Sequence, residues 1–259
     1  MRYQLATDAR PQARKLLFAA LLTIALWFIP YAGIVTYPFR LFVTFIHEGG
    51  HAIASLLTGN AVRSLTVAPN ASGLTETYMT NAGLFTQTVI SSAGYVGAML
   101  FGALLLVLVR RTVAARLVLA GSAVFIGLLT LVYGFIVPLT HMSFSPFTVG
   151  TGALLVAGLL AAARYLSPRA ANFLVGFLAV QCVLNALFDL KDVLFLSVAT
   201  DAQTDALNMA HATGVPAFFW SLIWIGLAFI ILSAALRAYA VSRNKPSQPD
   251  LPFEDAPTV

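Results

Sequence analysis

The chain has 259 residues, of which 59% are hydrophobic and only 10% are Asp, Glu, Lys or Arg. A soluble domain carries about 25% charged residues, so this composition excludes an ordinary water-soluble fold and indicates a protein surrounded by a lipid bilayer. The formal net charge is +5, but the basic residues lie at the ends of apolar runs. That pattern is a membrane-topology signal, and we expect no nucleic-acid partner.

Seven apolar runs divide the chain, and a helix needs about 20 apolar residues to cross a hydrocarbon core of about 30 Å. In chain order the runs cover residues 16–36, 38–58, 83–109, 117–137, 147–163, 171–197 and 217–240. The sequence therefore predicts an all-α, multi-pass transmembrane helix bundle. We expect one membrane-embedded domain over residues 1–240, followed by a disordered cytoplasmic tail over 241–259. The first run is too long for a signal-peptide core and is expected to be retained.

Residues 61–80, which follow the second run, have the pattern of a short hairpin. Apolar residues alternate through Val62, Leu65 and Val67, and the turn-forming segment 69–73 comes next. Non-helical backbone at membrane depth is tolerated only where protein or water satisfies its polar groups. We therefore expect a re-entrant or interfacial hairpin beside a hydrated site.

The basic clusters at 110–116, 164–169 and 237–245 are expected in the cytoplasm, together with both termini. This orientation places the segments near 138–146 and 198–215 outside. Three apolar runs precede Arg110, and three crossings from a cytoplasmic N-terminus would place that residue on the wrong side. One of the first three runs is therefore expected not to be a simple crossing.

The segment His47-Glu48-Gly49-Gly50-His51 matches the H-E-x-x-H pattern inside the second run. Residues four apart share a helix face, so both imidazoles can reach one metal ion while Glu48 lies alongside as a general base for water. Zinc in such sites takes three protein ligands and keeps a fourth position open. Ionisable groups inside an apolar run are expensive and usually functional. The two glycines indicate close approach of a helix or substrate backbone, or ordinary small-residue packing.

A third ligand is expected from the run at 171–197, where polar residues fall on one helix face. They are Gln181, Asn185, Asp189 and Asp192. Asp189 is the predicted metal ligand, because it lies deeper in the run. Asn185, one turn earlier, is expected either to orient that carboxylate or to hydrogen-bond a substrate carbonyl. Asp192 is interpreted as a helix-end residue near water.

The other histidines, the cysteine and a ridge of small residues are less suited to metal binding or catalysis. His141 and His211 lie in predicted outer loops and remain alternatives for the third ligand. The lone cysteine, Cys182, lies within an apolar run and is expected to serve packing. Gly94, Ala98 and Gly102 form a small-residue ridge on the third run, which is interpreted as a helix-packing face.

Several segments resemble the site-2 protease class of intramembrane zinc metallopeptidases, especially a compact bacterial branch without an inserted PDZ-like domain. The resemblance covers about two thirds of the chain. It runs through HEGGHAIASLLTGNAV at 47–62, SGLT at 72–75, SSAGYVGAMLFG at 91–102, NALFDL at 185–190 and TGVPAFFW at 213–220.

The resemblance implies a zinc metalloendopeptidase in the bacterial inner membrane, acting on membrane-protein or peptide substrates by intramembrane proteolysis. It implies His47 and His51 as zinc ligands, Glu48 as general base and Asp189 as the acidic ligand. Better-known members carry N-x-x-P before an L-D-G motif, whereas this chain has NALFDL, without the proline or the following glycine.

Three functions follow from these patterns. The first is a zinc protease that cuts a transmembrane or juxtamembrane segment, with the hairpin at 61–80 pairing the substrate as an added strand. The second is a metal-binding membrane scaffold or transporter without proteolytic activity. The third is an inactive relative that binds a partner, which the intact HEGGH segment argues against. The oligomeric state is left open.

Overall fold

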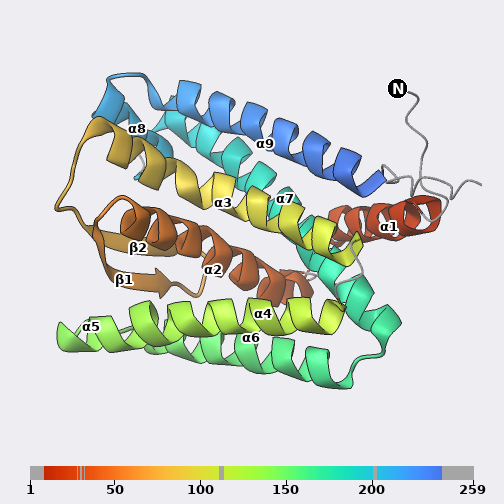
Figure 1. The fold of residues 1–259 in the computed structure, drawn as a ribbon. Helices are drawn as coiled ribbons and strands as arrows, with labels where there is room; N and C mark the ends of the chain where they lie inside the picture. Colours follow the sequence, from red (N-terminus) through yellow and green to blue (C-terminus); the bar gives the residue numbers. More distant parts are fainter. Residues whose placement is uncertain are drawn as a thin grey trace, which may run out of the picture.

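The computed structural model describes residues 9–27, 29, 31, 33–110, 114–200 and 203–240. In those parts the chain is an all-α bundle with one small hairpin, as predicted (Figure 1). The elements are α1 (Ala9–Trp27), α2 (Gly33–Leu57), β1 (Ala61–Val67), β2 (Gly73–Tyr78), α3 (Leu84–Arg110), α4 (Ala115–Leu128), the π-helix η1 (Leu129–Ile136), α5 (Val137–Thr140), α6 (Pro146–Tyr165), α7 (Pro168–Ala199), α8 (Asp205–Thr213) and α9 (Ala217–Ala240).

Five helices of the described chain are long and apolar enough to cross a membrane. They cover Leu84–Leu108, Ala115–Thr140, Pro146–Tyr165, Pro168–Ala199 and Ala217–Ala238. The second of these is continuous through α4, η1 and α5. The apolar part of α1 is shorter, at Leu16–Leu26, and α2 is not among the five. Two of the first three runs therefore fall outside the five, whereas the sequence led us to expect that one of them is not a simple crossing.

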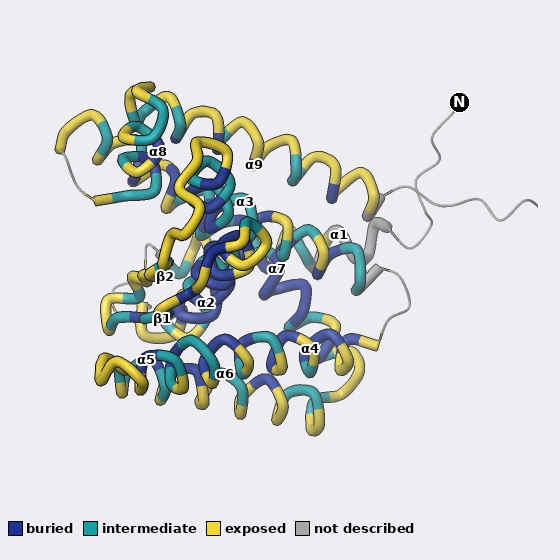
Figure 2. The backbone as a smooth tube through the Cα atoms, turned by 60° about the vertical axis from the view of Figure 1, so that its left-hand side comes forward, coloured by how far each residue is buried: buried dark blue, intermediate teal, exposed yellow. Residues whose placement is uncertain are grey.

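Helix α2 lies at the centre of the molecule, while the outward faces of α6 and α9 are exposed (Figure 2). The glycines at positions 49 and 50 of this helix let neighbouring helices come close. A Cβ at Gly49 would lie 2.7 Å from the Leu129 side chain, and a Cβ at Gly50 would overlap the backbone carbonyl of Ala93 on α3. The glycines therefore serve helix packing, which was one of their two predicted roles.

The hairpin is antiparallel, with Ala61 opposite Tyr78 and Val67 opposite Gly73. Strand β1 buries Val62, Leu65 and Val67, as its alternation predicted. The Val67 backbone N–H donates to Thr148 Oγ1 on α6 at 2.9 Å. Through these contacts, β1 is fixed against the bundle.

The turn of the hairpin docks along α2. The Tyr37 hydroxyl donates to the Pro69 carbonyl at 2.6 Å, and Thr44 Oγ1 donates to the Ala71 carbonyl at 2.8 Å. The two carbonyls lie in the turn, where the strand pairing supplies no donor for them, so these side-chain bonds satisfy them. The hairpin and α8 lie at the same end of the bundle (Figure 1).

Candidate metal centre

The two histidines of HEGGH lie on successive turns of α2 and point the same ring atom at each other. His47 Nε2 and His51 Nε2 are 3.0 Å apart. His51 Nδ1 lies 2.7 Å from the carbonyl oxygen of Ile90 on α3. Since a carbonyl only accepts, the His51 Nδ1–H donates to it, and Nε2 is the ring atom that faces His47, as in a metal-binding histidine held by a carbonyl.

Tyr95 on α3 fixes the other imidazole. The ring of His47 meets the ring of Tyr95 edge to face, with centroids 4.6 Å apart and an interplanar angle of 81°. A carbonyl thus orients His51 and an aromatic ring orients His47, both from the same neighbouring helix.

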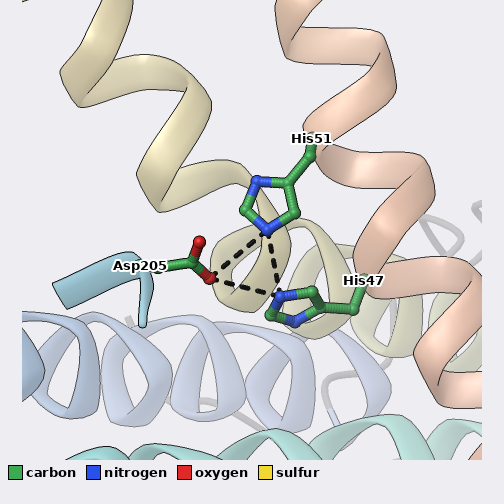
Figure 3. Close-up of side chains that lie close together, drawn as sticks. All are labelled: His47, His51 and Asp205. Atoms are coloured by element: carbon green, nitrogen blue, oxygen red, sulfur yellow. Dashed lines mark hydrogen bonds and ion pairs between the residues drawn. The ribbon is translucent and has the colours of Figure 1, made fainter. Parts of the chain in front are cut away.

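The carboxylate of Asp205 faces both imidazoles (Figure 3). Its Oδ2 lies 3.3 Å from His47 Nε2 and 3.3 Å from His51 Nε2. Asp205 is the first residue of α8, where the Thr204 side chain caps the helix by accepting from the Leu207 N–H at 3.2 Å.

The spacing of these three atoms fits a tetrahedral metal ion. Ligand atoms that each lie about 2.1 Å from one tetrahedral zinc are separated from one another by about 3.4 Å. Across the described residues, the group of His, Cys, Asp and Glu side chains close enough to hold one ion consists of His47, His51 and Asp205, with ligand atoms within 4.8 Å of one another. Two imidazoles and a carboxylate suit zinc.

The electrostatics of Asp205 agree with this geometry. Asp205 lies on α8, which is not one of the five apolar helices. Burial alone would raise the pKa of the Asp205 carboxyl, but the charge of His51 and the hydrogen bonds from both imidazoles outweigh it. They hold that pKa below its ordinary value. The carboxylate is therefore ionised and able to bind a cation.

Asp189, the predicted third ligand, is not the carboxylate that lies beside the two histidines. It projects from α7 into the wall of the same cavity and lies outside the group of three. Asp192 is exposed and pairs with Lys191 at 2.8 Å, in keeping with its interpretation as a helix-end residue. Of the alternative histidines, His211 lines the cavity and His141 does not.

Sequence reasoning missed Asp205 because it assigned residues 198–215 to an outer loop. The segment carried local signals of a short helix: Thr204 suits an N-cap, and Gly214 ends α8 with φ of 74°. Recognising that helix would have drawn attention to the acidic residue in its first turn.

Glu48 is buried next to His47 and His51 and is held by the hairpin. Only 4% of Glu48 is exposed, so its carboxylate needs hydrogen-bond partners. Thr75 Oγ1 on β2 lies 2.8 Å from Glu48 Oε2 and donates to it. A Cβ at Gly73 would lie 2.6 Å from Glu48 Cγ. The glycine at this position lets β2 pass directly over the general-base candidate.

Gly94 has a role besides the helix packing that was predicted for it. A Cβ on Gly94 would overlap the Nε2 atoms of both His47 and His51. Gly102, further along α3, packs against Cys182 and Ala179 of α7, as a packing ridge should. The start of the ridge therefore leaves room for the histidine pair, and its end packs two helices together.

A cavity of about 660 Å³ is lined by His47, Glu48, His51 and Asp205. Its walls come from α2, the hairpin, the start of α3, α7 and α8. Asn185 lines it, but its amide nitrogen donates to the backbone and side-chain oxygens of Gln181, at 2.9 and 3.0 Å. Both amide hydrogens are thereby used, so the group that Asn185 has left for a substrate is an acceptor oxygen.

Comparison with known proteins gives one match. The family model described as Peptidase M50B-like matches residues 17–235, which include the HEGGH segment, the hairpin and Asp205. Neither a curated protein nor a solved structure matches the chain. The family is that of the site-2 proteases, which confirms the resemblance seen in the sequence. The chain belongs to the Peptidase M50B-like family.

Proposed function

We propose that this protein is an intramembrane zinc metalloprotease that hydrolyses peptide bonds in or near transmembrane segments. The observation that supports it best is the spacing of three ligand atoms, at 3.0, 3.3 and 3.3 Å, with Glu48 beside them in one cavity. Family membership and the five apolar helices support the same conclusion.

In this proposal His47, His51 and Asp205 hold the zinc, and Asp205 takes the place expected for Asp189. When bound, zinc supplies Lewis acidity, which polarises a peptide carbonyl and lowers the pKa of water towards about 7. Glu48 accepts a proton from the attacking water and returns it to the leaving amine. Thr75 orients the Glu48 carboxylate by donating to Oε2.

Strand β2 offers a way to hold the substrate backbone. In the described chain the sheet has two strands, so β1 occupies one edge of β2 and leaves the other without a strand partner. Residues 73–75 of β2 line the cavity beside Glu48. An extended substrate segment can pair with that edge by main-chain hydrogen bonds, which would place a peptide bond near the metal centre.

The test is Glu48→Gln in the purified, detergent-solubilised protein, with Glu76→Gln as the matched control. Glu76 lies on β2, next to Thr75, but it is half-exposed and pairs with Arg63. Glu48→Gln should keep about one zinc per chain and lower the cleavage rate of a membrane-anchored reporter at least about 100-fold, because the amide cannot accept a proton. Glu76→Gln should cleave at the wild-type rate.

Three outcomes would count against the proposal. Full cleavage by Glu48→Gln rejects the mechanism, and loss of zinc from that variant makes Glu48 a structural residue. Wild-type protein that holds zinc but cuts no peptide points to the metal-binding scaffold or transporter instead.

A further inference from the structure

Tyr95, on α3, carries a hydroxyl group that the protein itself leaves without a partner. The residue lines the metal cavity and is only 7% exposed. Within the residues that the structure describes, its hydroxyl group makes no hydrogen bond. A buried tyrosine O–H usually has such a partner. The Tyr95 hydroxyl is therefore a free donor, and a group that enters the cavity is the partner it lacks.

The position of this hydroxyl follows from what surrounds it. No side-chain nitrogen or oxygen of the described chain is both fully enclosed and without a hydrogen-bond partner. Since the Tyr95 oxygen has no partner, it borders open space, and Tyr95 lines the cavity. Its ring contacts the ring of His47, and a Cβ on the preceding residue, Gly94, would overlap Nε2 of both histidines. The free donor therefore lies beside the metal centre.

Two aromatic neighbours fix the ring that carries the hydroxyl. The ring centroid of Tyr95 lies 4.6 Å from that of His47 on α2 and 5.5 Å from that of Trp224 on α9. Trp224 is held in turn, because its indole N–H donates to Ser92 Oγ on α3 at 3.1 Å. Helix α3 packs against both α2 and α9 (Figure 1). A donor fixed in this way needs no reorganisation when negative charge develops beside it.

Several other donors of the cavity already bond within the chain. Arg40 keeps unused N–H groups, but it is exposed and precedes His47 by about 10 Å along the axis of α2. These groups are therefore less suited than Tyr95 to a charge that develops next to the two histidines. The side chains that already donate to an oxygen atom of the protein are Thr44, Ser72, Thr75, Gln87 and Asn185.

Ser91, one turn before Tyr95 on α3, is the other cavity residue with a hydroxyl group that is buried and unbonded in the described chain. It is 8% exposed. A serine within a helix can turn its hydroxyl onto the carbonyl four residues earlier, here that of Gln87. The phenol oxygen of Tyr95 cannot do the same, because the ring separates it from its own backbone. Burial of Ser91 therefore requires no ligand, whereas burial of Tyr95 does.

We propose that the Tyr95 hydroxyl donates a hydrogen bond to the carbonyl oxygen of the scissile peptide bond and stabilises the negative charge that develops there. This role rests on the protease function proposed for the same site. As water adds to the carbonyl carbon, the π electrons of the C=O bond move to its oxygen and Glu48 takes a proton from the water. The C=O bond then re-forms, the C–N bond breaks, and the amine leaves with the proton from Glu48. Tyr95 keeps its own proton throughout.

The first test compares Tyr95→Phe with the wild-type protein on a membrane-anchored reporter. Phenylalanine keeps the ring against His47, so zinc content should stay the same. Removal of one such donor costs about 100- to 1,000-fold in kcat, so Tyr95→Phe should lower kcat at least about 100-fold and leave KM within about threefold. Tyr133→Phe is the matched control, because Tyr133 lies on η1 and does not line the cavity. It should cleave at the wild-type rate.

The second test measures binding and not turnover. A phosphinic peptide with the cleavage sequence of the reporter carries an anionic, tetrahedral group at the position of the scissile carbonyl. Its affinity should fall by about the same factor as kcat/KM in Tyr95→Phe, because both depend on the same hydrogen bond. Zinc affinity, from competition with a chelator, should not change. A side chain that only packs against His47 would leave the affinity for the phosphinic peptide unaltered.

The remaining outcomes separate this role from the protease function itself. If the wild-type protein cuts the reporter and Tyr95→Phe cuts it equally fast, the role of Tyr95 is wrong and the protease function stands. Zinc loss from Tyr95→Phe also overturns the role, because the hydroxyl then supports the metal site. A larger fall of kcat in Ser91→Ala than in Tyr95→Phe assigns the donor to Ser91 instead. If the zinc-loaded wild-type protein cuts nothing, both the protease function and the role of Tyr95 fail.

Discussion

Replacing Asp205 with alanine is expected to remove most of the zinc from the protein, whereas Asp189→Ala is expected to leave it bound. Both are aspartates in the wall of one cavity, so the two variants delete the same chemical group from the same surroundings. Only Asp205 has a carboxylate oxygen within 3.3 Å of both imidazole nitrogens.

The expected size of the effect follows from the role of each group. Loss of a residue that merely orients a metal ligand lowers affinity by about 10- to 100-fold. Loss of a direct ligand should exceed that range, so Asp205→Ala should weaken zinc binding by more than about 100-fold, or about 2.7 kcal/mol. Asp189→Ala should weaken it by less than about tenfold, since this carboxylate acts on the site only from a distance.

Zinc affinity is measured by competition with a chromogenic chelator, and metal content by elemental analysis of the purified variants. Asp205 also lies in the first turn of α8, where a negative charge stabilises the helix by about 0.3 to 1 kcal/mol. A thermal unfolding curve of each metal-free variant shows whether α8 still folds, and Asp205→Asn keeps the shape if alanine does not. Equal zinc loss in Asp205→Ala and Asp189→Ala, or greater loss in the second, would refute the assignment.

Three further predictions concern the same centre. His51→Ala should lose zinc, because one of the two imidazole ligands is gone, and wild-type metal content in this variant would disprove the site. Gly94→Ala should also lose zinc, since its Cβ would overlap both ligand nitrogens, whereas Gly158→Ala, with nothing within 4 Å, should keep it; full occupancy in Gly94→Ala would contradict the geometry. Thr75→Val should lower kcat by about tenfold through loss of the bond to Glu48, and Thr75→Ser should restore it; an unchanged kcat in the valine variant would show that the bond does not position Glu48.

The sequence by itself determined the features that depend on local patterns. Apolar runs of about 20 residues predict membrane helices from length alone, and the structure has five of them from residue 84 onward. The spacing of His47 and His51 is set by the pitch of one helix, so their convergence could be predicted without knowing any neighbour. The turn residues at 69–73 likewise predicted the hairpin.

Only the tertiary structure decided which carboxylate joins the histidines. Asp189 lies in the C-terminal half of α7 and Asp205 begins the short helix that follows it, and the polar stripe on α7 favoured Asp189. A stripe shows that a face avoids lipid, but it does not fix which residue reaches a metal, because that depends on how helices dock and where the chain folds back. Here α8 packs against α3 and α9, and this long-range arrangement brings Asp205 to the two imidazoles of α2.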